Sequence, residues 1–130
     1  MANIGRIEDE YVHLHAGETA GMMPGGARFW QALTAGELPA LAQGRLVSGY
    51  RFDRDWSSWE MHPYGEEFVC LLSGAVDVLL EHSTSIEAVE LRAPGSFVMV
   101  PVGVWHTAKV HAPSHMLFIT PGRDTQHRPL

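Results

Sequence analysis

The stretch of the chain that most constrains its fold is residues 59–74, WEMHPYGEEFVCLLSG. Its first residues have the short, partly aromatic composition of a strand, the Pro-Tyr-Gly step is typical of a turn, and a second strand begins at Glu67. Side chains two positions apart in a strand share a face, so Glu60 and His62 point to the same side. The predicted hairpin brings Glu60, His62 and Glu67 together, and divalent metals accept such carboxylate and imidazole ligands.

A second stretch, residues 95–110, reads GSFVMVPVGVWHTAKV. It predicts a strand, a Pro-Val-Gly turn and another strand that carries His106. His106 would arrive from a different hairpin as a fourth donor. The sequence therefore predicts one metal site with four candidate ligands: Glu60, His62, Glu67 and His106.

These two stretches resemble the two sequence motifs of the cupin superfamily. The first family motif is a His-x-His pair, a Glu after three or four residues and a Gly after six more; His62, Glu67 and Gly74 stand at three of these positions. The second motif is Gly, five residues, Pro-x-Gly, two residues and His. Four residues match it at every spacing: Gly95, Pro101, Gly103 and His106.

The chain departs from the family pattern at two positions. Glu60 stands where the family has its first His, and Val110 stands where it usually has an Asn. The first change keeps a metal ligand but replaces an imidazole with a carboxylate. The second removes a polar group beside the site. The resemblance thus implies ligation by His62, Glu67 and His106, with Glu60 as a fourth ligand or as a catalytic general base.

The strand pattern agrees with this resemblance. From residue 46 onward, short apolar runs alternate with turn residues, which is typical of a sandwich or a barrel. With the motifs, it predicts an all-β fold, a double-stranded β-helix of the jelly-roll type. Residues 28–35 and 37–43 predict one or two short N-terminal helices. The expected strands are residues 11–15, 46–52, 58–62, 67–74, 75–81, 89–91, 97–100, 105–110 and 115–120.

The length of the chain and its ends complete the expected organisation. A chain of 130 residues is long enough for one domain with a core, so residues 1–130 are expected to form a single cupin domain. Residues 1–10 are expected to be a loose arm, residues 20–26 a loop and residues 121–130 a polar tail.

Composition excludes several classes of function. The formal net charge is −6 and the chain has a single Lys, so a basic surface for nucleic acid is not expected. No apolar run approaches the ~20 residues of a membrane span, and the N-terminal residues lack the apolar region of a signal peptide. The one cysteine, Cys70, rules out an intramolecular disulfide and is expected to be a buried packing thiol. A cytoplasmic protein is the expectation.

The predicted donors share strand faces with apolar residues, so they are expected to line a mainly apolar pocket. Those neighbours are Val69, Leu71, Ala108 and Val110, with Tyr50, Phe52, Met116 and Phe118 as further lining. Two carboxylates in such surroundings require a divalent metal or a shared proton. With two Glu and two His and no thiolate, the ion would be Mn or Fe at least as readily as Zn.

The remaining candidates are expected to be structural. Glu66 is expected on the solvent side of its strand. The other His-x-His pair, His13 and His15, lacks acidic partners nearby and is expected on the surface. His127, in the tail, is expected in solvent or folded over the pocket. Trp56, Trp59 and Trp105 are expected in the core or in dimer contacts.

Two functions remain open at this point. The resemblance implies a metal-dependent enzyme that acts on a small organic molecule as a dioxygenase, an isomerase or a lyase. The alternative is a binding or sensing module that holds a small ligand or a metal without turnover, or a metal-free cupin pocket. An open coordination position beside a substrate-sized pocket favours the enzyme. The resemblance also implies a homodimer.

Overall fold

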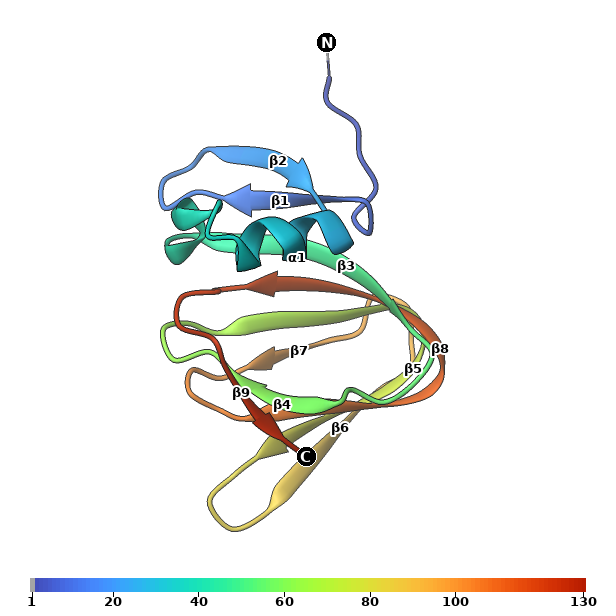
Figure 1. Cartoon of the computed structure of the whole chain (residues 1–130). Helices are drawn as coiled ribbons and strands as arrows, with labels where there is room; N and C mark the ends of the chain where they lie inside the picture. Colours follow the sequence, from blue (N-terminus) through green and yellow to red (C-terminus); the bar gives the residue numbers. More distant parts are fainter. Residues whose placement is uncertain (1) are drawn as a thin grey trace.

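The computed structural model describes residues 2–130 and consists mainly of antiparallel strands (Figure 1). The elements in chain order are β1 (Glu10–Leu14), β2 (Ala20–Pro24), α1 (Ala27–Thr34), the 3-10 helix η1 (Pro39–Ala42), β3 (Arg45–Phe52), β4 (Ser58–Met61), β5 (Glu67–Glu81), β6 (Ile86–Leu91), β7 (Phe97–Val100), β8 (His106–Thr120) and β9 (Gln126–Pro129).

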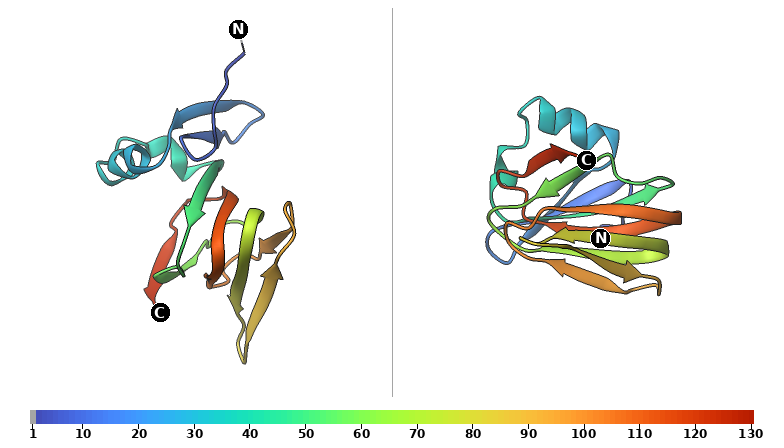
Figure 2. Two further views of the ribbon diagram at one scale, coloured as in Figure 1. Left: turned by 90° about the vertical axis from the view of Figure 1, so that its right-hand side faces the viewer. Right: turned by 90° about the horizontal axis from the view of Figure 1, so that it is seen from below.

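Two long strands, β5 and β8, organise the barrel (Figure 2). They pair with each other along most of their length, from Phe68 opposite Ile119 to Leu80 opposite His106. The C-terminal half of β8 also pairs with β3, and its first residue pairs with β4 through Glu60. β6 and β7 pair with successive parts of β5. This all-β jelly roll, with two short helices between β2 and β3, confirms the predicted fold class.

The predicted end of a strand at Gly74 is wrong, because β5 continues through it to Glu81. Gly74 has φ = 101°, and a Cβ atom there would collide with Ser114 on β8. The β5–β8 register shifts three times across this bend. The strands expected at residues 105–110 and 115–120 are likewise the two halves of one strand, β8. Glycine at position 74 allows the backbone to bend without ending the pairing.

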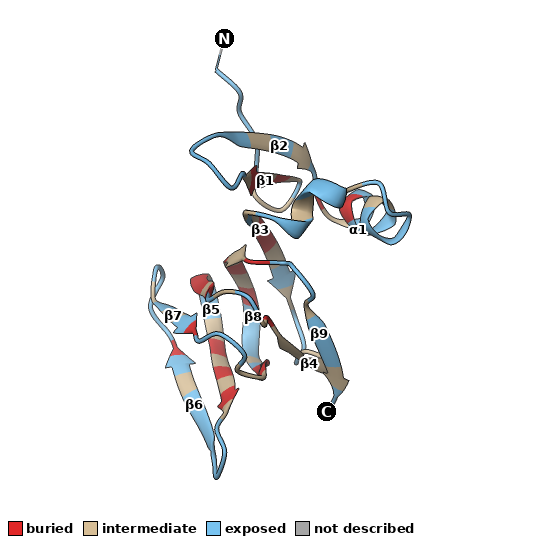
Figure 3. Ribbon diagram, turned by 90° about the vertical axis from the view of Figure 1, so that its left-hand side faces the viewer, coloured by how far each residue is buried: buried red, intermediate tan, exposed pale blue. Residues whose placement is uncertain are grey.

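The bend changes which residues of β5 face the core. Before it, the odd-numbered Val69 and Leu71 are fully buried, and after it the even-numbered Val76 and Val78 are. A slip of one position exchanges the two faces of a strand, so the register shift keeps both halves apolar on the inside. Figure 3 shows the alternating buried positions of β5. The rest of the core comes from Leu80, Leu91, Val100, Ala108, Met116 and Phe118.

The N-terminal residues extend the sheet beyond β3 and place a helix beside the barrel. β1 pairs with both β2 and β3, so the loop expected at residues 20–26 is largely a strand. The predicted helix is confirmed as α1, and its buried Phe29 packs on Tyr11 with ring centroids 5.1 Å apart. Among residues 2–130, no helix combines the length and the apolar character needed to cross a membrane.

The C-terminal residues also differ from the expected tail, because Gln126–Pro129 form β9 along β4. Arg128 of β9 lies over two indole rings, 4.6 Å from the centroid of Trp105 and 5.4 Å from that of Trp59. Its guanidinium also pairs with the carboxylate of Glu81. These contacts hold a strand with no apolar alternation against the barrel.

Replacing Arg128 by Ala is therefore expected to reduce the free energy of unfolding by about 1–2 kcal/mol, because both the ring contacts and the ion pair are lost. Urea unfolding followed by circular dichroism measures this. Arg54→Ala is the matched control, because within residues 2–130 Arg54 pairs only with its neighbour Asp53 and both side chains are exposed. Equal stabilities of the two variants would contradict the role of Arg128.

Candidate metal centre

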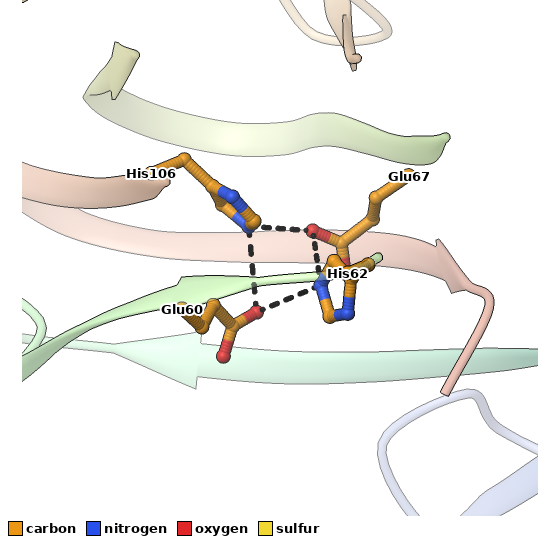
Figure 4. A group of neighbouring side chains, drawn as sticks. All are labelled: Glu60, His62, Glu67 and His106. Carbon is orange, nitrogen blue, oxygen red and sulfur yellow. Dashed lines mark hydrogen bonds and ion pairs between the residues drawn. The ribbon is translucent and has the colours of Figure 1, made fainter. Parts of the chain in front are cut away.

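The four predicted donors meet in the structure (Figure 4). Glu60 lies on β4, His62 directly follows it, Glu67 begins β5 and His106 begins β8. One ligand atom from each lies within 4.8 Å of the others. Three of the four residues are buried, and the side chain of Glu60 is 24% exposed.

The carboxylates and imidazoles alternate around a closed ring of contacts. Glu67 Oε1 lies 3.0 Å from His106 Nε2 and 3.4 Å from His62 Nε2. Glu60 Oε1 lies 3.5 Å and 3.4 Å from the same two nitrogens. Each ring nitrogen therefore faces two carboxylate oxygens, an arrangement in which one cation can contact all four groups.

Hydrogen bonds behind the ring fix the orientation of His62. Thr125 Oγ1 donates to Gly122 O, at 3.2 Å, and lies 2.9 Å from His62 Nδ1. A hydroxyl has one proton to donate, so Thr125 accepts from His62 Nδ1–H. The other nitrogen, Nε2, is buried and makes no hydrogen bond within residues 2–130. With Nδ1 protonated, the lone pair of a neutral His62 points into the ring.

The other buried donors are oriented in the same way. A backbone carbonyl can only accept, so His106 Nδ1–H donates to Val104 O, at 3.1 Å, and Nε2 faces the ring. Thr120 donates to Glu67 Oε2, at 2.6 Å, which leaves Oε1 directed at the imidazoles. Outer partners of this kind are typical of metal-binding His and Glu residues.

Electrostatics couple the four groups. Burial alone would lower the pKa of both imidazoles, but the carboxylates that face them outweigh it, so the pKa of His62 rises to about 9 and that of His106 to about 10. Burial alone would raise the pKa of both carboxyls. The imidazoles outweigh it, lowering the pKa of Glu60 to about 2 and that of Glu67 below its usual range. Without a metal, two imidazolium ions neutralise two carboxylates.

The donor set fits a divalent metal ion by three criteria. The ligand atoms converge, both imidazoles present Nε2 to the same point, and one of these nitrogens, His62 Nε2, is buried without a hydrogen bond within residues 2–130. Two neutral imidazoles and two carboxylates would balance the charge of a divalent ion. Oxygen and nitrogen donors without thiolate suit Fe, Mn and Zn.

The ring of donors borders a cavity of about 770 Å³, within the usual size of small-molecule sites. Glu60, His62 and Glu67 all line it, so a molecule in the cavity can approach the donors directly. His127 of β9 also lines it, with Nε2 3.6 Å from Glu60 Oε2.

The structure separates the expected lining into two groups. Tyr50, Phe52 and Phe118 line the cavity as predicted, but the other expected residues do not. Met116, Val69, Leu71 and Ala108 are buried in the core, and Val110 packs against it. Trp56 packs against the core, as expected, and it also borders the cavity.

Three further expectations concern single residues. Glu66 is exposed and Cys70 is buried, as predicted. His13 was expected on the surface but is buried, with Nε2 2.7 Å from Gln43 O.

Sequence reasoning missed two hydroxyls, Thr120 and Thr125. Neither belongs to a motif, and Thr125 reaches His62 through a loop and strand that follow the predicted barrel. Thr120 is the last residue of the strand expected at residues 115–120 and Thr125 lies beyond it, so no motif spacing pointed to either one.

No protein family model matches the chain, and no curated protein sequence matches it. Among solved structures, it is similar to a cupin-2 domain protein from Shewanella frigidimarina, with a TM-score of 0.51 and 16% identity over 59% of this chain and 70% of that one. An oxalate oxidase bound to the substrate analogue glycolate has a TM-score of 0.56 and 16% identity over 71% of this chain. The match spans 50% of the oxidase.

A third similar structure is Peruvianin-I, a cysteine peptidase from Thevetia peruviana latex, with a TM-score of 0.57 and 17% identity over 74% of this chain and 63% of that one. These likenesses show that the chain has the cupin fold. The fold hosts different chemistries, so function has to be argued from the site.

The pKa shifts predict how metal-free protein responds to pH. A histidine whose pKa is raised in the folded state stabilises that state fully below about pH 6.5, its pKa in the unfolded chain. This stabilisation is lost as the pH rises through the folded-state pKa values of His62, about 9, and His106, about 10. The carboxyl groups, whose pKa values are lowered in the folded state, contribute their full stabilisation above about pH 4.5. In chelator, the melting temperature is thus expected to fall between pH 6.5 and 10.

Thermal melts across this range test the expectation. The control is His82→Ala, which replaces an exposed histidine that pairs with Glu87. This variant is expected to keep the wild-type slope of melting temperature against pH. His62→Gln is expected to flatten it. A wild-type slope no steeper than that of His62→Gln would contradict the charge pairing.

Proposed function

We propose that the chain binds one divalent metal ion through Glu60, His62, Glu67 and His106 and acts on a small organic molecule held in the adjoining cavity. One observation carries the proposal: four donors converge at the cavity wall, and one of them, His62 Nε2, is buried without a hydrogen-bond partner among the described residues. The solved structures of similar fold include an oxalate oxidase and an Fe(II)-containing HppE, which supports metal chemistry on this scaffold.

The ion would be Fe, Mn or Zn, and when bound it supplies a Lewis acid that polarises an oxygen of the substrate. The surrounding residues hold the reactants. The apolar cavity excludes water around the substrate, and Thr120 and Thr125 fix the orientations of Glu67 and His62. An open position is expected where the ring of donors faces the cavity.

Glu60 is proposed to serve as a ligand through Oε1 and as the general base through Oε2. Oε1 faces both imidazoles, whereas Oε2 turns away toward His127 Nε2, 3.6 Å away. Glu60 also lines the cavity, so Oε2 can take a proton from a substrate bound beside it. The carboxylate at the family's first His position would then add a base without removing a ligand.

The rival proposal is a binding module that holds an organic ligand without metal or turnover. The charge balance favours it, because two imidazolium ions already neutralise the two carboxylates. Metal content separates the two proposals.

Protein purified without tags or chelators is expected to contain about one divalent ion per chain, because four donors are already in place. Elemental analysis measures this and identifies the metal. The His106→Ala variant is expected to lose most of it. His82→Ala is the matched control, since His82 lies in an exposed turn and its imidazole pairs with Glu87. Wild-type protein that lacks metal and takes up none on reconstitution would overturn the metalloenzyme proposal.

A second variant tests the hydrogen bond that orients His62. Thr125→Val keeps the shape of the side chain but removes the acceptor of His62 Nδ1–H, so the affinity for Zn²⁺ is expected to fall about 10-fold to 100-fold. Competition with a chromophoric chelator measures it. Thr84→Val, in an exposed turn, is the control. Equal Zn²⁺ affinities for the two variants would show that Thr125 does not position the ligand.

Three further expectations stay proposals: residues 1–130 as a single cupin domain, a cytoplasmic location and a homodimer. Exposed apolar side chains support the homodimer, notably Phe97, 55% exposed, and Met99, 39% exposed, on β7. Size-exclusion chromatography with light scattering would contradict it by returning the monomer mass.

A further inference from the structure

The cavity beside the ring of donors has a continuous aromatic wall. Ring centroids of Tyr50 and Phe52 on β3 lie 5.9 Å apart, and each packs on Phe118 of β8, at 5.7 Å and 6.2 Å. Trp56, in the segment after β3, packs on Phe52 and Phe118 at 5.7 Å and 5.8 Å. These four residues, the aromatic wall, all line the cavity.

The aromatic wall adjoins the donors. The ring of Trp56 lies 6.3 Å from the imidazole of His106, so the wall ends beside one of the four donors. A flat ring stacked on the wall would have its edge next to the cluster. Ring stacking of this kind favours planar partners over saturated ones of the same size.

The cavity also has an apolar border outside the barrel. Trp30 and Leu33 of α1 line it, yet their exposed fractions are 48% and 39%. Two large apolar side chains left in water at the edge of a cavity are positioned to be covered by an apolar ligand. Tyr50 of the wall lines the same cavity as Trp30, so the helix and the barrel border one binding space.

The size of the cavity exceeds that of a single ring. Its lining on β3 runs from Leu46 to Phe52, which corresponds to about 20 Å at ~3.3 Å per strand residue. Together with the volume of about 770 Å³, this length accommodates a compound of two or more fused rings.

The charges at the cavity disfavour an anionic ligand. Within the described chain, the lining includes two arginines, and both are paired: Arg51 lies 3.5 Å from Glu8, and Arg54 lies 3.3 Å from Asp53. Asp55 and Asp124 add further negative charge to the lining. An uncharged ligand avoids repulsion from these carboxylates.

We infer that the substrate is an uncharged planar aromatic compound of two or more fused rings, which stacks on the aromatic wall and directs an oxygen substituent at the four donors. This inference rests on the proposed function and specifies its substrate class.

Calorimetric binding to metal-loaded protein tests the inference with three probes that share a skeleton of two fused six-membered rings. They are 2-naphthol, its saturated counterpart decahydro-2-naphthol, and the anion naphthalene-2-sulfonate. The 2-naphthol is expected to bind about threefold to tenfold more tightly than the saturated alcohol, as stacking energies predict. It is also expected to bind more tightly than the sulfonate, because the carboxylates of the lining repel the anion. Equal affinity for the saturated alcohol would overturn the aromatic class, and equal affinity for the sulfonate would overturn the uncharged class.

Two variants locate the binding. Phe52→Leu removes a ring from the wall and Trp30→Leu removes one from α1, and each is expected to weaken 2-naphthol binding about threefold to tenfold. Trp30 is half exposed, so its replacement leaves the core intact. The control is Phe97→Leu, on the outer face of β7 and 55% exposed. Unchanged affinity in both cavity variants would overturn the inference.

Separate measurements test metal binding and the substrate class, so one can be wrong while the other holds. Metal content of the same samples, measured by elemental analysis, decides whether the cluster binds an ion. The preference for 2-naphthol, measured again after chelator treatment, decides the substrate class, because the aromatic wall does not depend on the ion.

Discussion

The burial of two carboxylates is the constraint on which the site depends. Glu67 is almost completely buried and Glu60 is three-quarters covered, and isolated charges in such positions would destabilise the fold. Two imidazoles that face the same oxygens balance these negative charges. A divalent ion would supply the same two positive charges from one point. The site therefore has two compatible charge-balanced states, protonated and metal-loaded, and pH shifts the balance between them.

The barrel brings these groups together from distant parts of the chain. Glu60 and His106 occupy opposite positions in paired strands, and Glu67 begins the strand that pairs with the rest of β8. The bend at Gly74 allows β5 to remain one strand while its apolar residues face inward on both sides of the bend. Strand β9 then closes the site from the outside, held by Arg128. Core packing and site geometry thus share the same long strands.

The sequence predicted the fold and the donors because both depend on short-range spacing. Alternation along a strand places Glu60 and His62 on one face, and motif spacing identifies Glu67 and His106. It did not predict β9, whose residues show no apolar alternation and which pairs through tertiary contacts. For the same reason Thr125 was missed. Three of the four rings of the aromatic wall, those on β3 and β8, were predicted from strand parity, but Trp56 in the following loop was not, and neither was the apolar border on α1.

The central claim is that one ion sits among these four side chains. Anomalous scattering from a crystal of metal-loaded protein, measured at the absorption edge of the bound element, tests it most directly. The account predicts a single strong peak between Nε2 of His62, Nε2 of His106 and the Oε1 atoms of Glu60 and Glu67. A peak at another histidine, such as His13, or none in fully reconstituted protein, would contradict it.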